Sequence, residues 1–221
     1  MAIENLTLAP YYSGTRNPFN YQKVEQISRD ISTEWLTLDE ITQQLNLFQD
    51  ESQDSYLSSL EIATRMAIED YLGISMYSTQ YRVYYGDPGL NGTAIYLDLP
   101  ETGVATQGGG VEIDSVQYYT GDNNAVLQTL ASSNYYYDPS GNRVVITAGI
   151  PSPLAQNIAN PVRVTYTVSD SLLTAYPVIK QAGLLLFTHL YNNRSNSTTE
   201  KIREIPFGVA TLLRPYKPLV M

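Results

Sequence analysis

The spacing of apolar residues changes twice along this chain of 221 residues, and no other feature constrains its fold as strongly. Between Leu38 and Leu72 apolar residues recur every three or four positions, which is typical of helices with one buried face. From about residue 78 to residue 168 apolar and polar residues alternate, as in half-buried strands. The helical period returns after Pro177. The pattern therefore predicts an α+β fold, in which a small helical bundle carries a β-strand insertion (78–168) between its second and third long helices.

The three long helices are expected over residues 37–48, 55–72 and 177–192. The first begins with a capping box, because the Thr37 hydroxyl can accept from the Glu40 amide while the Glu40 carboxylate reaches back. Gly73 follows the second helix and supplies the left-handed residue that often ends a helix. Local signals therefore mark these two helix ends.

The same spacing assigns the faces of the second and third helices. In the second helix, Glu61, Arg65 and Glu69 fall on one side and are expected to face solvent. The third helix is apolar nearly all round. We expect it to be the central helix of the core, because a helix without a polar face is usually buried.

Six short strands are predicted inside the insertion, over residues 80–84, 94–99, 111–118, 135–137, 143–146 and 162–166. Residues 138–142, Asp-Pro-Ser-Gly-Asn, have the composition of a turn and make a hairpin of the fourth and fifth strands. The strands are too short and too few for a large separate barrel. A small antiparallel sheet or sandwich is expected instead.

The N-terminal segment, residues 1–34, is predicted to be an extended arm, with a candidate short helix around residues 24–31. A disordered tail is the alternative, since the segment lacks clear periodicity. Tyr11, Tyr12, Phe19 and Tyr21 favour an arm that lies on another surface, because solvated tails are usually poor in aromatic residues.

The remaining residues, 35–221, are expected to form one domain that ends in a C-terminal arm over residues 206–221. The arm begins with a short helix or turn over residues 206–213. Two prolines then favour an extended segment from Arg214 to Pro218, because proline cannot continue a helix.

Composition excludes several classes of function. The net charge is −9, with 13 Lys and Arg against 22 Asp and Glu, so a basic DNA-coating surface is excluded. The absence of cysteine excludes disulfides, thiolate metal sites and a cysteine nucleophile. Charged residues make up only 16%, and there are 19 tyrosines, a balance typical of protein interfaces. A globular protein that uses tyrosine in its strands would have the same composition.

No catalytic, cofactor or metal site is predicted. His189 is the only histidine and lies on the apolar third helix, where a partly buried structural role is expected. Paired carboxylates such as Glu69 and Asp70 could serve a hydrolase, but no spacing selects one pair. The N-terminus lacks the features of a signal peptide, and no apolar run approaches the length needed to cross a membrane.

Five blocks of sequence, in this order, resemble the head–tail connector (adaptor) proteins of tailed phages, the HK97 gp6-like class. They are Trp35–Glu40, Ala67–Gly73, Val162–Tyr166, Pro177–Ala182 with Tyr191–Arg194, and Ile205–Val209 with Leu213–Tyr216. The chain departs from the family in its N-terminal extension of about 30 residues, its longer β insertion, and Thr167-Val168-Ser169 where Thr-Ala-Gly is common.

The resemblance implies a structural protein without catalysis or cofactor. It would form a homo-oligomeric ring, usually of twelve copies, beneath the portal protein. It would also contact a tail or stopper protein, and double-stranded DNA would pass through its channel without specific binding. It would be located in the virion, at the head–tail vertex, and in the host cytoplasm during assembly.

Two interaction segments are predicted within this connector hypothesis. The portal interface is assigned to the C-terminal segment, at Pro206, Phe207, Leu213, Pro215, Tyr216, Leu219 and Val220. The arm contacts, with neighbours or tail proteins, are assigned to Tyr11, Tyr12, Phe19 and Tyr21. The alternative function is a Tyr-rich carbohydrate-binding module of a phage tail or surface protein, because aromatic rings stack on sugars.

Overall fold

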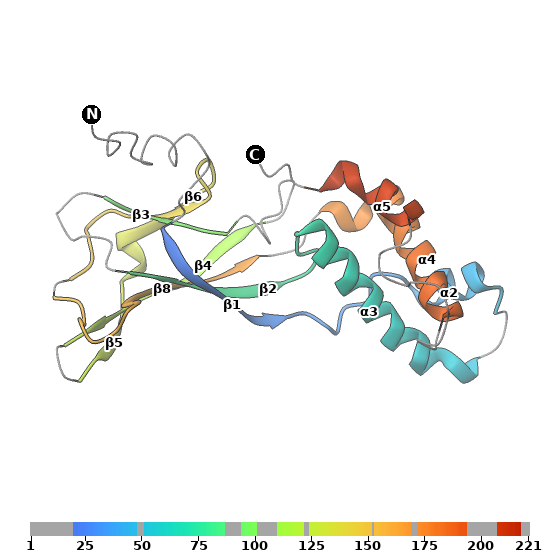
Figure 1. Ribbon diagram of the computed structural model, residues 1–221, viewed down its shortest axis with the longest axis horizontal. Helices are drawn as coiled ribbons and strands as arrows, with labels where there is room; N and C mark the ends of the chain where they lie inside the picture. The colour runs from blue at the N-terminus through green and yellow to red at the C-terminus, as the bar shows by residue number, and fades with distance from the viewer. Residues whose placement is uncertain are drawn as a thin grey trace, which may run out of the picture.

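A computed structural model describes residues 20–47, 51–86, 94–100, 110–121, 124–151, 153–168, 172–193 and 207–217. Its helices gather at one end of the molecule and its strands at the other, so that a helical lobe and a sheet lobe lie end to end (Figure 1). Each lobe has its own cluster of buried apolar residues. The fold is therefore mixed α and β, with two cores rather than one.

The helical lobe contains α2 (Leu38–Leu45), α3 (Asp54–Leu72), α4 (Pro177–Asn192) and α5 (Phe207–Leu213). Both predicted ends are confirmed. Thr37 and Glu40 form the capping box of α2, and Gly73 ends α3 with a φ of 70°. The amides of Gly73 and Ile74 both donate to the carbonyl of Glu69, at 2.8 and 3.3 Å. These bonds satisfy a helix-end carbonyl that would otherwise lack a partner.

The larger sheet has five antiparallel strands in the order β1-β2-β8-β4-β5. They are β1 (Tyr21–Arg29), β2 (Thr79–Tyr85), β8 (Val162–Val168), β4 (Val111–Thr120) and β5 (Val126–Thr129). Side chains of β2, β4 and β8 alternate between a buried and a more exposed face. Their buried residues form most of the core of the sheet lobe.

The smaller sheet has three antiparallel strands, β3 (Ile95–Asp98), β7 (Arg143–Ile146) and β6 (Tyr135–Asp138), with β7 in the middle. Strands β6 and β7 are the predicted hairpin, and Asn142 in its turn has a φ of 47°. Ile95, Leu97, Val144 and Ile146 pack into the same core as the larger sheet. The two sheets thus cover each other, as in a small sandwich.

The predicted helix around residues 24–31 is wrong, because Tyr21–Arg29 is a strand that pairs with β2. The β part is consequently not a simple insertion between two helices. Its edge strand β1 comes from the segment before the helices, and the other strands come from the segment between α3 and α4. Strand β1 was missed because its alternation is weak. Only Val24 and Ile27 of its nine residues are aliphatic, and the others are polar or charged apart from one tyrosine.

Two further expectations about the helices need correction. Helix α4 is not buried all round, since Val178 and Leu185 are each 38% exposed. The segment after α5 is not extended, since Arg214–Tyr216 forms one turn of 3₁₀ helix. Proline is tolerated there because Pro215 lies in the first turn, where its missing N–H costs no internal hydrogen bond. Within the described residues, no helix has the length and apolar character needed to span a bilayer.

Candidate interaction surfaces

The joint between the two lobes is built on one side of α3, by the three charged residues that were expected to face solvent. Glu61, Arg65 and Glu69 lie four residues apart and are at most 3% exposed. The expectation was wrong because two connecting segments, residues 30–36 and 74–78, cross this side of the helix. The three side chains pair with main-chain groups of those connectors rather than with water.

Glu61 binds the start of the helical lobe. Its Oε1 accepts hydrogen bonds from the amides of Trp35 and Leu36, at 3.0 and 3.2 Å. Its Oε2 has no hydrogen-bond partner among the described residues. Burial raises the pKa of the Glu61 carboxyl, an effect that the two amides and the nearby charge of Arg65 oppose.

Arg65 binds the segment between β1 and α2. It donates from Nη1 to the carbonyl of Thr33 and from Nη2 to the carbonyl of Asp30, and its guanidinium lies 4.8 Å from the ring centroid of Tyr77. The side chain of Asp30 accepts from the Thr33 hydroxyl and from the amide and hydroxyl of Ser32. These bonds hold the pKa of Asp30 well below its usual range. The connector is thus hydrogen-bonded along most of its length.

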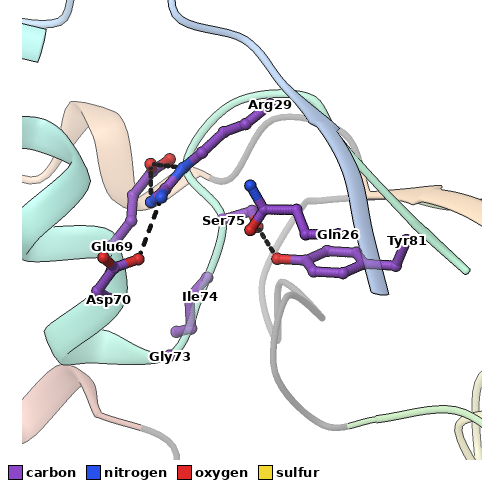
Figure 2. A pocket seen from close by; sticks show the side chains of 8 residues that line it. All are labelled: Gln26, Arg29, Glu69, Asp70, Gly73, Ile74, Ser75 and Tyr81. Carbon is purple, nitrogen blue, oxygen red and sulfur yellow. Dashed lines mark hydrogen bonds and ion pairs between the residues drawn. The ribbon is translucent and has the colours of Figure 1, made fainter. Parts of the chain in front are cut away.

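Glu69 joins α3 to β1, through Arg29 (Figure 2), and to the connector that leads into β2. Its Oε2 accepts from Nε of Arg29 at 2.8 Å, and its Oε1 accepts from the amides of Met76 and Tyr77 at 2.7 and 3.3 Å. Nη1 of Arg29 also lies 3.1 Å from Oδ1 of Asp70. Arg29, which is a residue of the edge strand, is therefore anchored to the helical lobe by two carboxylates.

A pocket of about 270 Å³ lies beside this ion pair (Figure 2). Its lining consists of Gln26, Arg29, Glu69, Asp70, Gly73, Ile74, Ser75 and Tyr81. Both carboxylates face Arg29, and the Tyr81 hydroxyl lies 3.0 Å from that of Ser75. No group of acidic or histidine side chains able to hold a metal occurs among the described residues. The pocket is therefore part of the joint between the lobes, and most of its polar side chains bind one another.

The outer face of the smaller sheet carries two exposed tyrosines. Tyr96 of β3 and Tyr136 of β6 lie opposite Val145 of β7, one on each side, and are 48% and 54% exposed. We call these three residues the tyrosine face. The guanidinium of Arg143 lies 4.5 Å from the ring centroid of Tyr96, and its Nε lies 3.0 Å from Oδ2 of Asp138. Tyrosine and arginine are enriched at the centres of protein interfaces.

Two other surfaces carry exposed apolar residues. Strand β1 is an edge strand with exposed Val24 and Ile27, but it carries Lys23 and two register irregularities. Such features normally protect an edge from pairing. On α4, Val178 and Leu185 lie two turns apart and form an apolar stripe that is partly exposed.

The structure places the predicted portal residues in different environments. Leu213 is fully buried in the helical core, so its side chain is not on the surface. Pro215 is exposed, and the ring of Tyr216 packs edge-on against Tyr176 at a centroid distance of 5.6 Å. Phe207 is the first residue of α5. Pro206, Leu219 and Val220 lie outside the described residues.

Of the predicted arm residues, only Tyr21 lies in the described part of the chain. It is the first residue of β1, pairs with Tyr85 and packs against the core of the sheet lobe. Tyr11, Tyr12 and Phe19 lie outside the described residues. His189 is half-buried near the end of α4, and its carbonyl accepts from the Asn193 amide and side chain.

Sequence reasoning missed the tyrosine face, although a signal for it was present. The alternation in residues 94–99 already places Tyr96 on the side opposite Ile95 and Leu97. Tyr136 is distant from Tyr96 in the sequence. Only the register of β3 and β6 on β7 shows that the two side chains lie on the same face.

Comparison with known proteins gives matches among solved structures alone. No protein-family model matches the sequence, and no curated protein matches it significantly. Three similar chains come from gene transfer agent (GTA) particles. They belong to the neck of an empty particle computed with C6 symmetry (18% identity, TM-score 0.57), the virion of a native particle (18%, 0.55) and the neck of a native particle computed with C12 symmetry (20%, 0.54).

Each of these alignments covers 90% of this chain and 96% of the matched chain. The likeness therefore extends over both lobes and is not limited to a common supersecondary motif. At 18–20% identity it establishes a shared fold. The chain has the fold of a protein found in the neck of gene transfer agent particles.

Proposed function

We propose that this protein is a structural component of a virion neck, a head–tail connector that joins the portal to the tail. The observation that carries the proposal is the end-to-end likeness to neck chains of gene transfer agent particles, with a TM-score of 0.57 and 96% of the matched chain covered. The five ordered sequence blocks of the connector class, the low charge and the 19 tyrosines support the same function. No catalysis and no cofactor belong to it.

Within this proposal the protein forms a ring, most simply of twelve copies. The necks of the similar particles were computed with C6 and C12 symmetry, which is consistent with that number. A ring requires a head-to-tail interface made of two different surfaces of each copy. The exposed tyrosine face and the apolar stripe on α4 are on different lobes, so the chain offers separate surfaces for neighbours and for other partners.

The first experiment is to count this chain in purified particles by quantitative mass spectrometry, normalised to the major capsid protein. About twelve copies per particle are expected for a single ring at the neck. Absence from particles, or hundreds of copies, would exclude a connector. The virion location is tested by the same measurement.

The portal is proposed to bind the C-terminal segment, through Pro215, Tyr216 and the residues that follow. Deleting residues 215–221 is expected to abolish binding to purified portal in a pull-down. Because Tyr216 packs on Tyr176, a deletion of residues 218–221 alone and the substitution Pro215→Ala should accompany it. If all three variants bind portal like the unmodified protein, the portal contact lies elsewhere.

A second candidate function is carbohydrate binding. It is favoured by the two exposed rings of Tyr96 and Tyr136, since aromatic faces stack on sugar rings. The full chain should be tested on a glycan array, because β1 lies outside residues 78–168 and completes the sheet. Binding that Tyr136→Ala abolishes would support this function, and an array without signal would remove it.

A further inference from the structure

We propose that, in the ring, the tyrosine face of each copy is covered by the N-terminal arm, residues 1–19, of a neighbouring copy. The inference rests on the proposed ring and names the contact that links its subunits. It depends on an exposed face, on the place where the arm leaves the described structure, and on the length and composition of the arm.

The face has the composition of an interface and no cover among the described residues. Tyr96 and Tyr136 are about half exposed, although their neighbour Val145 is 4% exposed. Arg143 and Asp138 lie on the same side of the sheet, two pairs further along, and form an ion pair. An apolar and aromatic centre with a polar border is the usual arrangement of a protein contact.

The arm begins at the edge of this same sheet. Asn20 donates from Nδ2 to the carbonyl of Tyr96, and its Oδ1 accepts from the amide of Asp98 at 3.0 Å. The amide of Asn20 also donates to Oδ2 of Asp98 at 3.3 Å. These three bonds occupy the outer edge of β3 and fix the point from which residues 1–19 depart.

The length of the arm favours a neighbour over its own subunit. From Asn20 to Tyr12 an extended chain spans up to about 26–29 Å. The strands of the smaller sheet have four residues each, which corresponds to about 13 Å. An extended arm therefore carries its aromatic pair, Tyr11 and Tyr12, past the end of its own sheet.

The composition of the arm suits the face that it would cover. Residues 1–19 contain only two charged side chains, Glu4 and Arg16, so docking desolvates few charges. Their apolar and aromatic residues include Ile3, Leu6, Leu8, Tyr11, Tyr12 and Phe19. Arm and face are also different parts of each copy, as a head-to-tail ring requires.

Cross-linking tests this contact directly, because the natural chain has no cysteine. A double variant, Tyr12→Cys with Tyr136→Cys, is incorporated into particles and treated with a short bismaleimide. A ladder of covalent multimers on a denaturing gel is expected. The matched control is Tyr12→Cys with Val178→Cys, which places the second thiol on the outer face of α4, at a residue that is 38% exposed, and should remain monomeric.

A monomer band alone would overturn the proposal, whether the two thiols have not reacted or are cross-linked within one chain. A ladder of the same intensity in the control would overturn it as well. Counting copies in the same particles separates the two claims. About twelve copies without a ladder contradicts the arm contact and leaves the connector intact. A copy number incompatible with one ring contradicts the connector itself.

Discussion

Glu61 has the sequence context of a surface residue and the environment of a core residue. It lies one helical turn from Arg65, a spacing common on exposed helix faces, where such pairs add a few tenths of a kcal/mol. In the structure its Oε1 is the acceptor for two buried amides, those of Trp35 and Leu36. The cost of losing that oxygen is the cost of leaving both amides unpaired.

We therefore expect Glu61→Ala to lower the free energy of unfolding by about 2–6 kcal/mol, from roughly 1–3 kcal/mol for each of the two unsatisfied buried donors. Urea unfolding of the free chain, followed by circular dichroism, measures this change in the free energy of unfolding. Glu34→Ala is the matched control, because Glu34 is an exposed glutamate of the same connector. Its effect should stay within about 0.5 kcal/mol. Equal effects of the two substitutions would contradict the assigned role of Glu61.

The raised pKa of Glu61 predicts a pH dependence of stability. A carboxyl whose pKa is higher in the folded state favours folding while it is protonated, and this contribution is lost as the pH rises through the folded pKa. Glu61→Gln keeps an oxygen for the two amides and cannot ionise. Its stability relative to the natural protein should therefore increase from pH 5 to pH 8 in urea unfolding. A difference that does not change with pH would show that Glu61 has the same pKa folded and unfolded.

The packing of α4 against the start of the helical lobe depends on one glycine. A Cβ atom at Gly183 would lie 2.5 Å from Cη2 and 2.6 Å from Cζ3 of Trp35, too close for any real contact. The indole cannot move away easily, because it is 5% exposed and its Nε1 donates to the carbonyl of Thr174 at 3.1 Å. Trp35 and α4, which are far apart in the sequence, thus fit together only with glycine at this position.

Gly183→Ala is expected to destabilise the protein, because overpacking costs about 1–3 kcal/mol and the gain in helix propensity is at most about 1 kcal/mol. Gly208→Ala in α5 is the matched control, since a Cβ atom there has no neighbour within 4 Å and helix propensity should raise stability slightly. Thermal unfolding of both variants distinguishes the effects. A melting temperature of Gly183→Ala at or above that of the natural protein would contradict the contact.

The molecule as a whole is two cores connected by a row of buried charges. The sheet lobe and the helical lobe each have an apolar cluster, and Glu61, Arg65 and Glu69 fasten the connectors between them. Hydrogen bonds depend on direction more than apolar contacts do, so this row fixes the orientation of one lobe relative to the other. A constant orientation is what a closed ring needs, because each copy repeats the same angle to its neighbour.

The net charge of −9 predicts that the protein does not hold DNA, as the proposed connector function requires. Fluorescence anisotropy with a labelled duplex should show no saturable binding even at about 50 mM salt, where contacts with phosphate are strongest. Saturable binding that weakens steeply with added salt would reveal a basic surface and would contradict free passage. A basic DNA-binding protein of similar size serves as the positive control.

Much of the fold could be predicted where neighbouring residues determine it. The capping box at Thr37, the helix end at Gly73 and the hairpin over residues 135–146 depend on interactions between residues a few positions apart. The buried alternation of β2 and β8 has the same origin, because strand geometry sends every second side chain into the core. These features agree with the positions expected from the sequence.

The remaining features depend on contacts between distant segments. Strand β1 forms because β2 offers an edge to Tyr21–Arg29, and the charged row of α3 is buried because connectors cross it. The tyrosine face exists only because β3 and β6 pair with opposite edges of β7. Helix ends and strand alternation are short-range properties, so composition and spacing specify them. Tertiary contacts decide which faces are buried and which remain exposed for a partner. The physical reason is that distant segments, when they pack together, exclude water from some polar groups and leave others solvated.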